Sequence, residues 1–87
     1  MKVEFTRAFI KTYNKRFQNN PQFRKKFEER TRLFSANPKY PLLHDHHLQG
    51  KQLTFRSFSI TGDIRVIYKL HEGVAYFVDI GTHNQVY

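Results

Sequence analysis

The segment IRVIYKL, residues 64–70, alternates with the two-residue period of a β-strand. Its even positions, from Ile64 to Leu70, fall on one face and are all apolar, whereas the odd positions, from Arg65 to Lys69, fall on the other and are mostly charged. A strand of this kind is typical of an antiparallel sheet that buries only one of its faces. We therefore expect helices to cover the face of Ile64, and Arg65 to point to the open face.

Turn signals on both sides of this strand predict an antiparallel meander. The turns are TGD at residues 61–63 and HEG at residues 71–73, so the outer strands are residues 53–60 and 74–80. The apolar positions of the first outer strand change phase near Arg56 and Ser57, which predicts a β-bulge or a strong twist there. The second outer strand is expected to place four apolar residues on one face: Val74, Tyr76, Val78 and Ile80.

The N-terminal half predicts a short strand, residues 1–5, followed by two helices. Thr6 can cap the first helix, because its hydroxyl can accept from a free amide of the first turn. Asn20 can cap the second, with Pro21 at the first helical position, and Asn37 ends it. The chain is thus expected to be one α+β domain, residues 1–87, of order β-α-α-β-β-β, with a two-helix hairpin on an antiparallel sheet. The helical stripes are Ile10, Tyr13 and Phe17, then Phe23, Phe27, Thr31 and Phe34.

Length and composition exclude several classes of protein. Eighty-seven residues, 39% of them apolar, can bury one small core and no second one. The absence of cysteine excludes disulfides and thiolate metal sites. The longest unbroken apolar stretch is five residues, too short to span a membrane, so no membrane partner is expected. The start, MKVEFTR, does not read as a signal peptide, and the expected location is the cytoplasm.

Positive charge is concentrated in the first half of the chain. The formal net charge is +8; residues 1–39 hold 11 basic and three acidic residues, whereas residues 40–87 hold four of each. This imbalance favours contact with a polyanion over a merely solvated helical face. The candidate phosphate contacts are Lys11, Lys15, Arg16, Lys25 and Lys26 on the helices and Lys69 on the open face of the sheet.

All five histidines lie in the second half, three of them in the segment HDHHLQG, residues 44–50. A zinc site is one interpretation, but the spacing lacks an HExxH helix and no cysteine can contribute, so no metal and no cofactor are expected. A plain surface loop is a second interpretation. Acid–base chemistry is a third, because imidazole titrates near neutral pH. Residues 44–50 enter the meander and residues 81–83 leave it, so His46 and His83 could both lie over the open face.

Two more residues have both a structural and a chemical interpretation. Arg65 is either an ordinary outward-facing sheet residue or a fixed cation that stabilises charge on a phosphate in a transition state. Asp63 lies in a tight turn, where Asp is more often a turn former than a catalyst.

Three stretches occur together: DHHLQG at residues 45–50, DIRVIYKL at residues 63–70 and IGTH at residues 80–83. Their order and spacing resemble the RelE/ParE superfamily of bacterial toxins, most closely its YafQ-like branch. The resemblance covers essentially the whole chain and implies a RelE-like fold. It also implies a ribosome-dependent mRNA endonuclease, in which the 2′-hydroxyl of the RNA attacks the adjacent phosphate and no metal takes part.

By position, the resemblance assigns catalytic roles to His46, Asp63, His83 and Arg65. It assigns stacking on an RNA base to the terminal aromatic residue, Tyr87.

Two positions depart from the YafQ-like pattern. Ser59 stands where those toxins carry a further catalytic His, and Asp79 stands where they carry an Arg. Arg65 could supply the missing positive charge, and the identity of the general base stays open between His46 and His83. These substitutions would allow attenuated activity or an altered codon preference, and the sequence leaves open whether either occurs.

Other functions are compatible with the same sequence. One is a non-catalytic ParE-like toxin that binds DNA gyrase, although such a protein needs no convergent His, Asp and Arg set. Another is an RNA-binding domain that has lost activity, as the two substitutions would allow. The partners implied by the toxin interpretation are the ribosome with mRNA in its A site and a cognate acidic antitoxin, expected to fold on the basic toxin.

Overall fold

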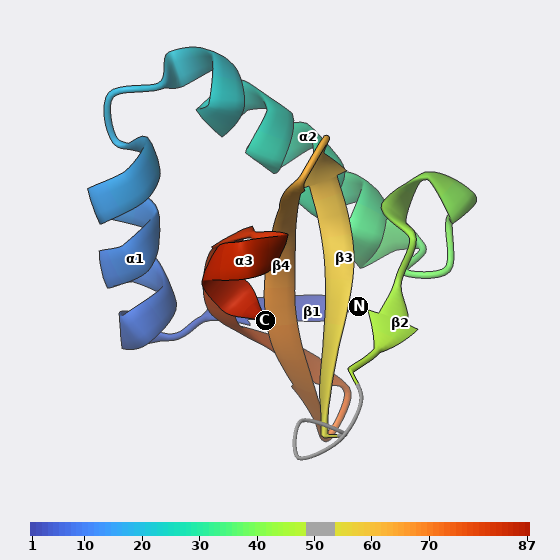
Figure 1. Cartoon of the computed structure of the whole chain (residues 1–87). Helices are drawn as coiled ribbons and strands as arrows, with labels where there is room; N and C mark the ends of the chain where they lie inside the picture. The colour runs from blue at the N-terminus through green and yellow to red at the C-terminus, as the bar shows by residue number, and fades with distance from the viewer. Residues whose placement is uncertain (49–53) are drawn as a thin grey trace.

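The computed structural model describes residues 1–48 and 54–87 of the chain. The order of elements begins with a strand and two helices, continues through a 3₁₀ turn and a short edge strand, and ends with three longer strands and a short helix (Figure 1). These elements are β1 (Lys2–Phe5), α1 (Arg7–Phe17), α2 (Pro21–Ala36), η1 (Pro41–Leu43), β2 (His46–His47), β3 (Phe55–Thr61), β4 (Ile64–His71), β5 (Val74–Thr82) and α3 (His83–Val86).

The strands form one five-stranded sheet in the order β1-β5-β4-β3-β2. Strands β2 to β5 pair antiparallel, whereas β1 pairs parallel to β5, with Lys2 opposite Val74. The predicted α+β class, the helical pair and the meander are confirmed, and the N-terminal strand makes the sheet mixed. Among the described residues, no helix is long and apolar enough to cross a membrane.

Both predicted helix caps are present. The Thr6 hydroxyl accepts from the Phe9 amide at 3.2 Å and donates to the Phe77 carbonyl at 2.7 Å, which joins the start of α1 to β5. The Asn20 side chain accepts from the Phe23 amide at 3.0 Å at the start of α2. A cap of this kind contributes about 1 kcal/mol by satisfying an amide that has no partner inside the helix.

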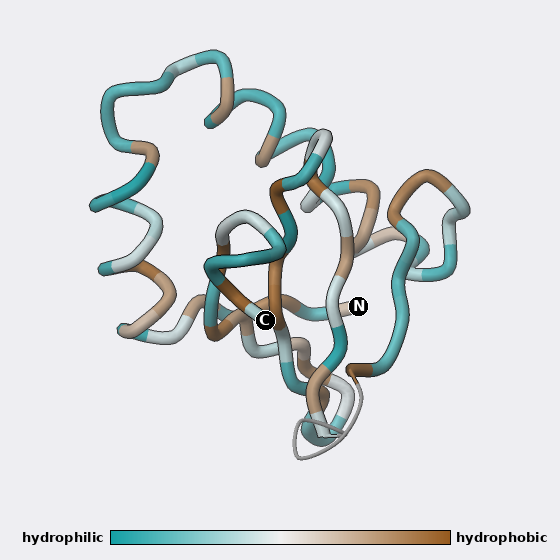
Figure 2. Tube along the Cα trace, in the orientation of Figure 1, coloured by the Kyte–Doolittle hydropathy of each residue, from teal (hydrophilic) through white to brown (hydrophobic). Residues whose placement is uncertain are grey.

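An aromatic core lies between the helices and one face of the sheet. Phe34 of α2, fully buried, stacks on Phe58 of β3 with ring centroids 4.3 Å apart, and its edge meets Tyr68 of β4 at 4.8 Å. Each such ring stabilises the fold by about 1.5–3 kcal/mol on burial. In Figure 2, hydrophobic positions recur between hydrophilic ones along both helices, as the spacing predicted. The core consists of Phe9, Phe23, Phe27, Phe34, Leu43, Phe58, Ile60, Val66, Tyr68, Ala75, Phe77 and Ile80.

Two predictions about which face the strand residues take were wrong in detail. The irregularity in β3 lies between Ser59 and Thr61, not near Arg56. A second irregularity leaves Val78 as an extra residue of β5, because Ile67 pairs with Asp79 while the next residue of β4 pairs with Phe77. An extra residue reverses which face the following side chains take. The core face of β5 therefore carries Ala75, Phe77 and Ile80, and of the four residues expected there only Ile80 belongs to the core.

The C-terminal boundary also differs from the prediction. Strand β5 runs on to Thr82, beyond the predicted end at residue 80, and residues 83–86 form α3, which was not predicted. The predicted start of the first outer strand of the meander, at residue 53, lies outside the described residues.

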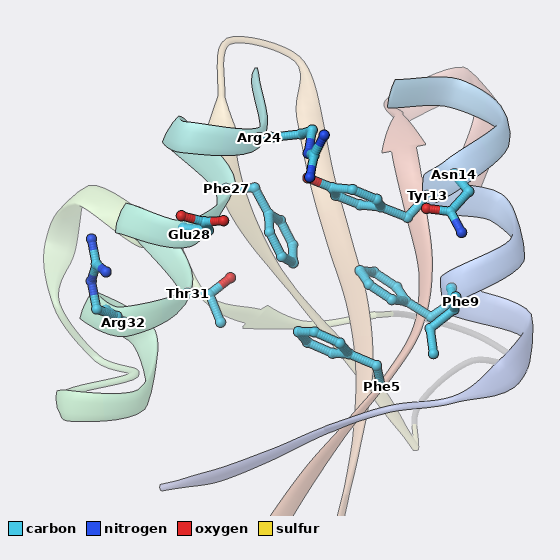
Figure 3. A pocket seen from close by; sticks show the side chains of 10 residues that line it. Phe5, Phe9, Tyr13, Asn14, Arg24, Phe27, Glu28, Thr31 and Arg32 are labelled. Carbon is cyan, nitrogen blue, oxygen red and sulfur yellow. The ribbon is translucent and has the colours of Figure 1, made fainter. Parts of the chain in front are cut away.

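An open groove of about 460 Å³ lies between α1 and α2 (Figure 3). Aromatic rings from β1, α1 and α2 form its floor, and Arg24, Glu28 and Arg32 lie along its α2 side. It contains none of the candidate catalytic residues.

Candidate active site

Arg65 of β4 is the centre of a cluster on the sheet face opposite α1 and α2. Its Nε donates to the Ser57 hydroxyl at 3.1 Å and to the Tyr87 hydroxyl at 3.0 Å, and its Nη2 donates to the His44 carbonyl at 3.0 Å. The neighbouring β4 residue Val66 is fully buried in the helix-covered core, so the alternation of the strand turns Arg65 away from the helices, as predicted. Arg65 is therefore held by β3, the segment before β2 and the C-terminus at once.

His46, on the edge strand β2, contacts Arg65 directly. Its Nδ1 lies 3.0 Å from the His44 carbonyl and 3.3 Å from Arg65 Nη2. The carbonyl can bond only to a protonated Nδ1, whereas the guanidinium can bond only to an unprotonated one. The first tautomer leaves Nε2 as a proton acceptor, and the second gives Nε2 a proton to donate. The first tautomer is the form that a general base needs, and its protonated form, with a proton on both nitrogens, keeps the bond to the His44 carbonyl and loses the one from Arg65.

His83 joins the cluster through the C-terminal residue. It is the first residue of α3, and its ring meets the Tyr87 ring edge-on at a centroid distance of 4.4 Å. The Tyr87 hydroxyl shares a 2.5 Å hydrogen bond with the Ser57 hydroxyl and also accepts from Arg65. Helix α3 was not predicted, although Thr82 and Gln85 have the capping-box spacing of a helix start. The four-residue separation of the two rings is the helical spacing that brings them together.

The remaining sequence-predicted residues lie at varying distances from this cluster. Lys69 shares the Arg65 face of β4 and is exposed, whereas Asp63 lies exposed in the turn between β3 and β4. Within residues 1–48 and 54–87, the Asp63 carboxylate makes no hydrogen bond or ion pair. The lysines of α1 and α2 belong to the other layer of the molecule, and Lys26 pairs with Glu29 at 3.9 Å. Lys11, Lys15 and Lys25 are exposed there.

Sequence reasoning missed a buried ionic network behind His46. The Asp45 side chain is only 6% exposed, and its Oδ1 lies 2.6 Å from Arg56 Nη2 and 2.7 Å from Arg56 Nε. The Tyr68 hydroxyl donates to the other carboxylate oxygen. The network ties the His44–His47 segment to β3 and β4, and His44 itself has left-handed backbone geometry, with φ 48°. The sequence did contain a signal for this network. Arg56 lies two positions before the core residue Phe58 and so on the same face of its strand, where a buried cation needs an anionic partner.

The network keeps each member in a defined charge state. Burial and then the hydrogen bond to Asp45 raise the pKa of Tyr68, so its hydroxyl keeps the proton that it donates. Burial alone would lower the pKa of Arg56, but the hydrogen bonds and charge of Asp45 and Tyr68 raise it overall. Arg56 thus remains the counter-charge of the Asp45 carboxylate.

Replacing Asp45 by Ala should destabilise the fold by about 3 kcal/mol, the lower end of the cost of breaking a buried ion pair, because Arg56 is 23% exposed and regains some solvent. The measurement is the urea midpoint of unfolding. The matched control is Glu29→Ala, which breaks an exposed pair and should cost less than about 1 kcal/mol. Equal midpoints for the two variants would contradict a stabilising role for the network.

Metal binding has little structural support within the described parts of the chain. No three His, Asp or Glu side chains in residues 1–48 and 54–87 are grouped as a metal site would require.

Comparisons with known proteins agree with this architecture. The family model described as "Bacterial toxin of type II toxin-antitoxin system, YafQ" matches residues 1–87. The structure of YafQ from E. coli strain BL21(DE3) is similar, with a TM-score of 0.76, 22% identity, and coverage of 99% of this chain and 97% of that one. A YoeB/ParE toxin from Agrobacterium tumefaciens is similar with a TM-score of 0.76 and 18% identity, over 95% of this chain and 99% of that one. A copper-bound mutant toxin from Helicobacter pylori is similar with a TM-score of 0.78 and 24% identity, over 100% of this chain and 99% of that one. The search of curated protein sequences found no match.

Proposed function

Because the chain belongs to the YafQ family of bacterial type II toxins, we propose that it is a cytoplasmic endoribonuclease that cuts mRNA in the ribosomal A site. The observation that carries the proposal is the cluster in which His46 and Tyr87 both contact Arg65, while Tyr87 holds the His83 ring. One imidazole in contact with the guanidinium, and a second joined to it through Tyr87, are groups that phosphodiester cleavage through the 2′-hydroxyl can use.

The proposed reaction needs one proton acceptor, one proton donor and one cation. One imidazole takes the proton of the 2′-hydroxyl as the 2′-oxygen forms a bond to phosphorus. The other gives a proton to the 5′-oxygen as its bond to phosphorus breaks, which leaves a 2′,3′-cyclic phosphate and a 5′-hydroxyl. Arg65 stabilises the charge on the non-bridging oxygens. Tyr87 is 41% exposed, so its ring can stack on a base while its hydroxyl keeps its hydrogen bonds to Ser57 and Arg65.

The proposed partners follow from family and charge. Type II toxins act with an antitoxin, and a chain of net charge +8 suits an acidic antitoxin that orders on binding. The same charge suits ribosomal RNA, with exposed lysines of α1 and α2 as phosphate contacts.

The decisive experiment adds purified protein to a translation reaction and maps the ends of the mRNA. We expect new ends within codons, formed only with ribosomes and carrying 2′,3′-cyclic or 3′-phosphate. Toxins of similar structure from Helicobacter pylori are described as copper-bound and metal-bound. A parallel reaction therefore uses 1,10-phenanthroline, which binds transition metals in preference to the magnesium that ribosomes need; cutting should persist. Intact mRNA together with inhibited DNA gyrase would favour the ParE-like alternative, and intact mRNA with retained RNA binding would favour lost activity.

Removing Lys25 and Lys26 together, by substitution with Ala, should reduce the salt dependence of ribosome binding. Each lost phosphate contact removes about one unit from the slope of log affinity against log salt concentration. The control removes two charges elsewhere, at Lys2 and Lys39, and should change the slope less. An unchanged slope in the α2 variant would show that this helix makes no phosphate contact.

A further inference from the structure

Arg16, at the end of α1, is directed at the sheet rather than at solvent. Its side chain is 30% exposed, its Nη1 donates to the Ile80 carbonyl at 2.5 Å, and the same nitrogen lies 3.8 Å from Asp79 Oδ1. The Asp79 carboxylate in turn accepts from the Ile80 amide at 2.8 Å. Arg16 is thus bound within the protein at the last residues of β5, immediately before His83.

Gly81 leaves room for this contact. A Cβ atom at Gly81 would lie 2.4 Å from Arg16 Nη1 and 2.6 Å from Gln85 Oε1, too close for either atom to stay in place. The Gln85 oxygen accepts from the Thr82 amide at 2.8 Å and so closes the first turn of α3. The guanidinium and the capping side chain therefore occupy adjoining space over the same glycine.

Helix α3 needs such external support. It has four residues, far fewer than an isolated helix needs to be stable in water. Its placement decides where His83 and the Tyr87 ring stand relative to Arg65. The bulge at Val78 directs Asp79 to Arg16, so the position where the family resemblance implied a cation instead receives one from α1.

We propose that Arg16 is a positioning residue, which holds the β5–α3 junction so that His83 and Tyr87 keep their places beside Arg65, and that it is not an RNA contact. The proposal rests on the proposed nuclease function for its kinetic test. A misplacement of about 1 Å in a reacting group can cost 10²-fold in rate, so losing Arg16 should slow cleavage at saturating ribosomes by about 10- to 100-fold.

The test compares Arg16→Gln with Arg7→Gln, which removes the same charge from an exposed position on the same helix. We expect Arg16→Gln to lower kcat, with ribosome affinity and its salt slope equal to those of Arg7→Gln. Arg16→Lys keeps the charge but not the reach of the guanidinium, and should be similarly slow. A lower affinity, a slope reduced by about one unit and rescue by Lys would instead identify a phosphate contact and overturn the proposal.

Gly81→Ala provides a second variant that disturbs the same junction from the other side. In the parent, the added methyl group should displace the Arg16 guanidinium and slow cleavage. In an Arg16→Ala background there is no guanidinium to displace, so the same substitution should slow cleavage less. Equal effects in both backgrounds would argue against the contact.

The NMR resonances of the His83 ring report on the junction without any catalysis. Arg16→Gln should shift them by altering the edge-on Tyr87 ring, and should leave those of His71, at the distant β4–β5 turn, in place. Unmoved His83 resonances would overturn the proposal. Shifted resonances in a protein that cuts no mRNA would uphold it and reject the nuclease function instead.

Discussion

His46→Ala and His83→Ala should each slow the cleavage of ribosome-bound mRNA by about 10² to 10⁴-fold, the usual contribution of a general acid or base. Each variant leaves one of the two proton transfers to water. The loss should appear in kcat rather than in ribosome affinity, because the phosphate contacts proposed to hold the ribosome come from the lysines of α1 and α2 and not from the imidazoles. The measurement is single-turnover cleavage on programmed ribosomes, with enzyme in excess.

Both variants should fold, since both side chains are exposed and neither belongs to the aromatic core. His71→Ala is the matched control: it removes an exposed imidazole at the β4–β5 turn and should cut at the parent rate. If His46→Ala and His83→Ala were both folded and both cut at near the parent rate, the catalytic assignment would be wrong. The His-rich segment would then be a surface feature only.

Local rules were sufficient for the framework of this fold. The caps at Thr6 and Asn20 depend on side chains and amides three residues apart, and both are present. The side of the sheet that Arg65 occupies depends on alternation within one strand, and this alternation correctly predicted that the guanidinium lies on the open face. These features share one property: every atom involved lies within a few residues in the sequence, where spacing determines geometry.

Apart from the short helix α3, the features that sequence reasoning missed are long-range. The Asp45–Arg56 pair joins residues 11 apart, and Arg16 reaches the Ile80 carbonyl across 64 residues. A pattern of residue types does not show which carboxylate will meet which cation once the chain is folded. The bulge at Val78 is similar, because its position follows from the register with β4 and not from the composition of β5.

Sequence reasoning singled out the members of this cluster but not the contacts that join them, and their catalytic roles stay predictions. His46, His83, Arg65 and Tyr87 were singled out separately, and the structure adds the bonds between them. Ser57 was not foreseen, although it is buried on the Arg65 face and bonds to both Arg65 and Tyr87. A serine in a strand gives no signal of this kind, since its role depends on what the neighbouring strand and the C-terminus bring to it.

Arg65→Ala should lower cleavage by about 10² to 10³-fold, by analogy with the loss of one transition-state hydrogen-bond donor. Its effect should exceed that of removing any single helical lysine, because a cation fixed by contacts to Ser57, Tyr87 and His44 is already oriented for the phosphate. Arg65→Lys should recover part of the rate, since an ammonium keeps the charge but cannot replace the donors of a planar guanidinium.

The double variant Arg65→Ala, His46→Ala decides whether the two side chains act together. In the parent, Arg65 Nη2 lies 3.3 Å from His46 Nδ1, so removing Arg65 takes away both the cation and one contact that orients the His46 ring. The loss of the second side chain should therefore cost less than it does in the parent. Rate losses that multiply fully would show that Arg65 acts on the phosphate alone, and that the His46 contact has no part in proton transfer.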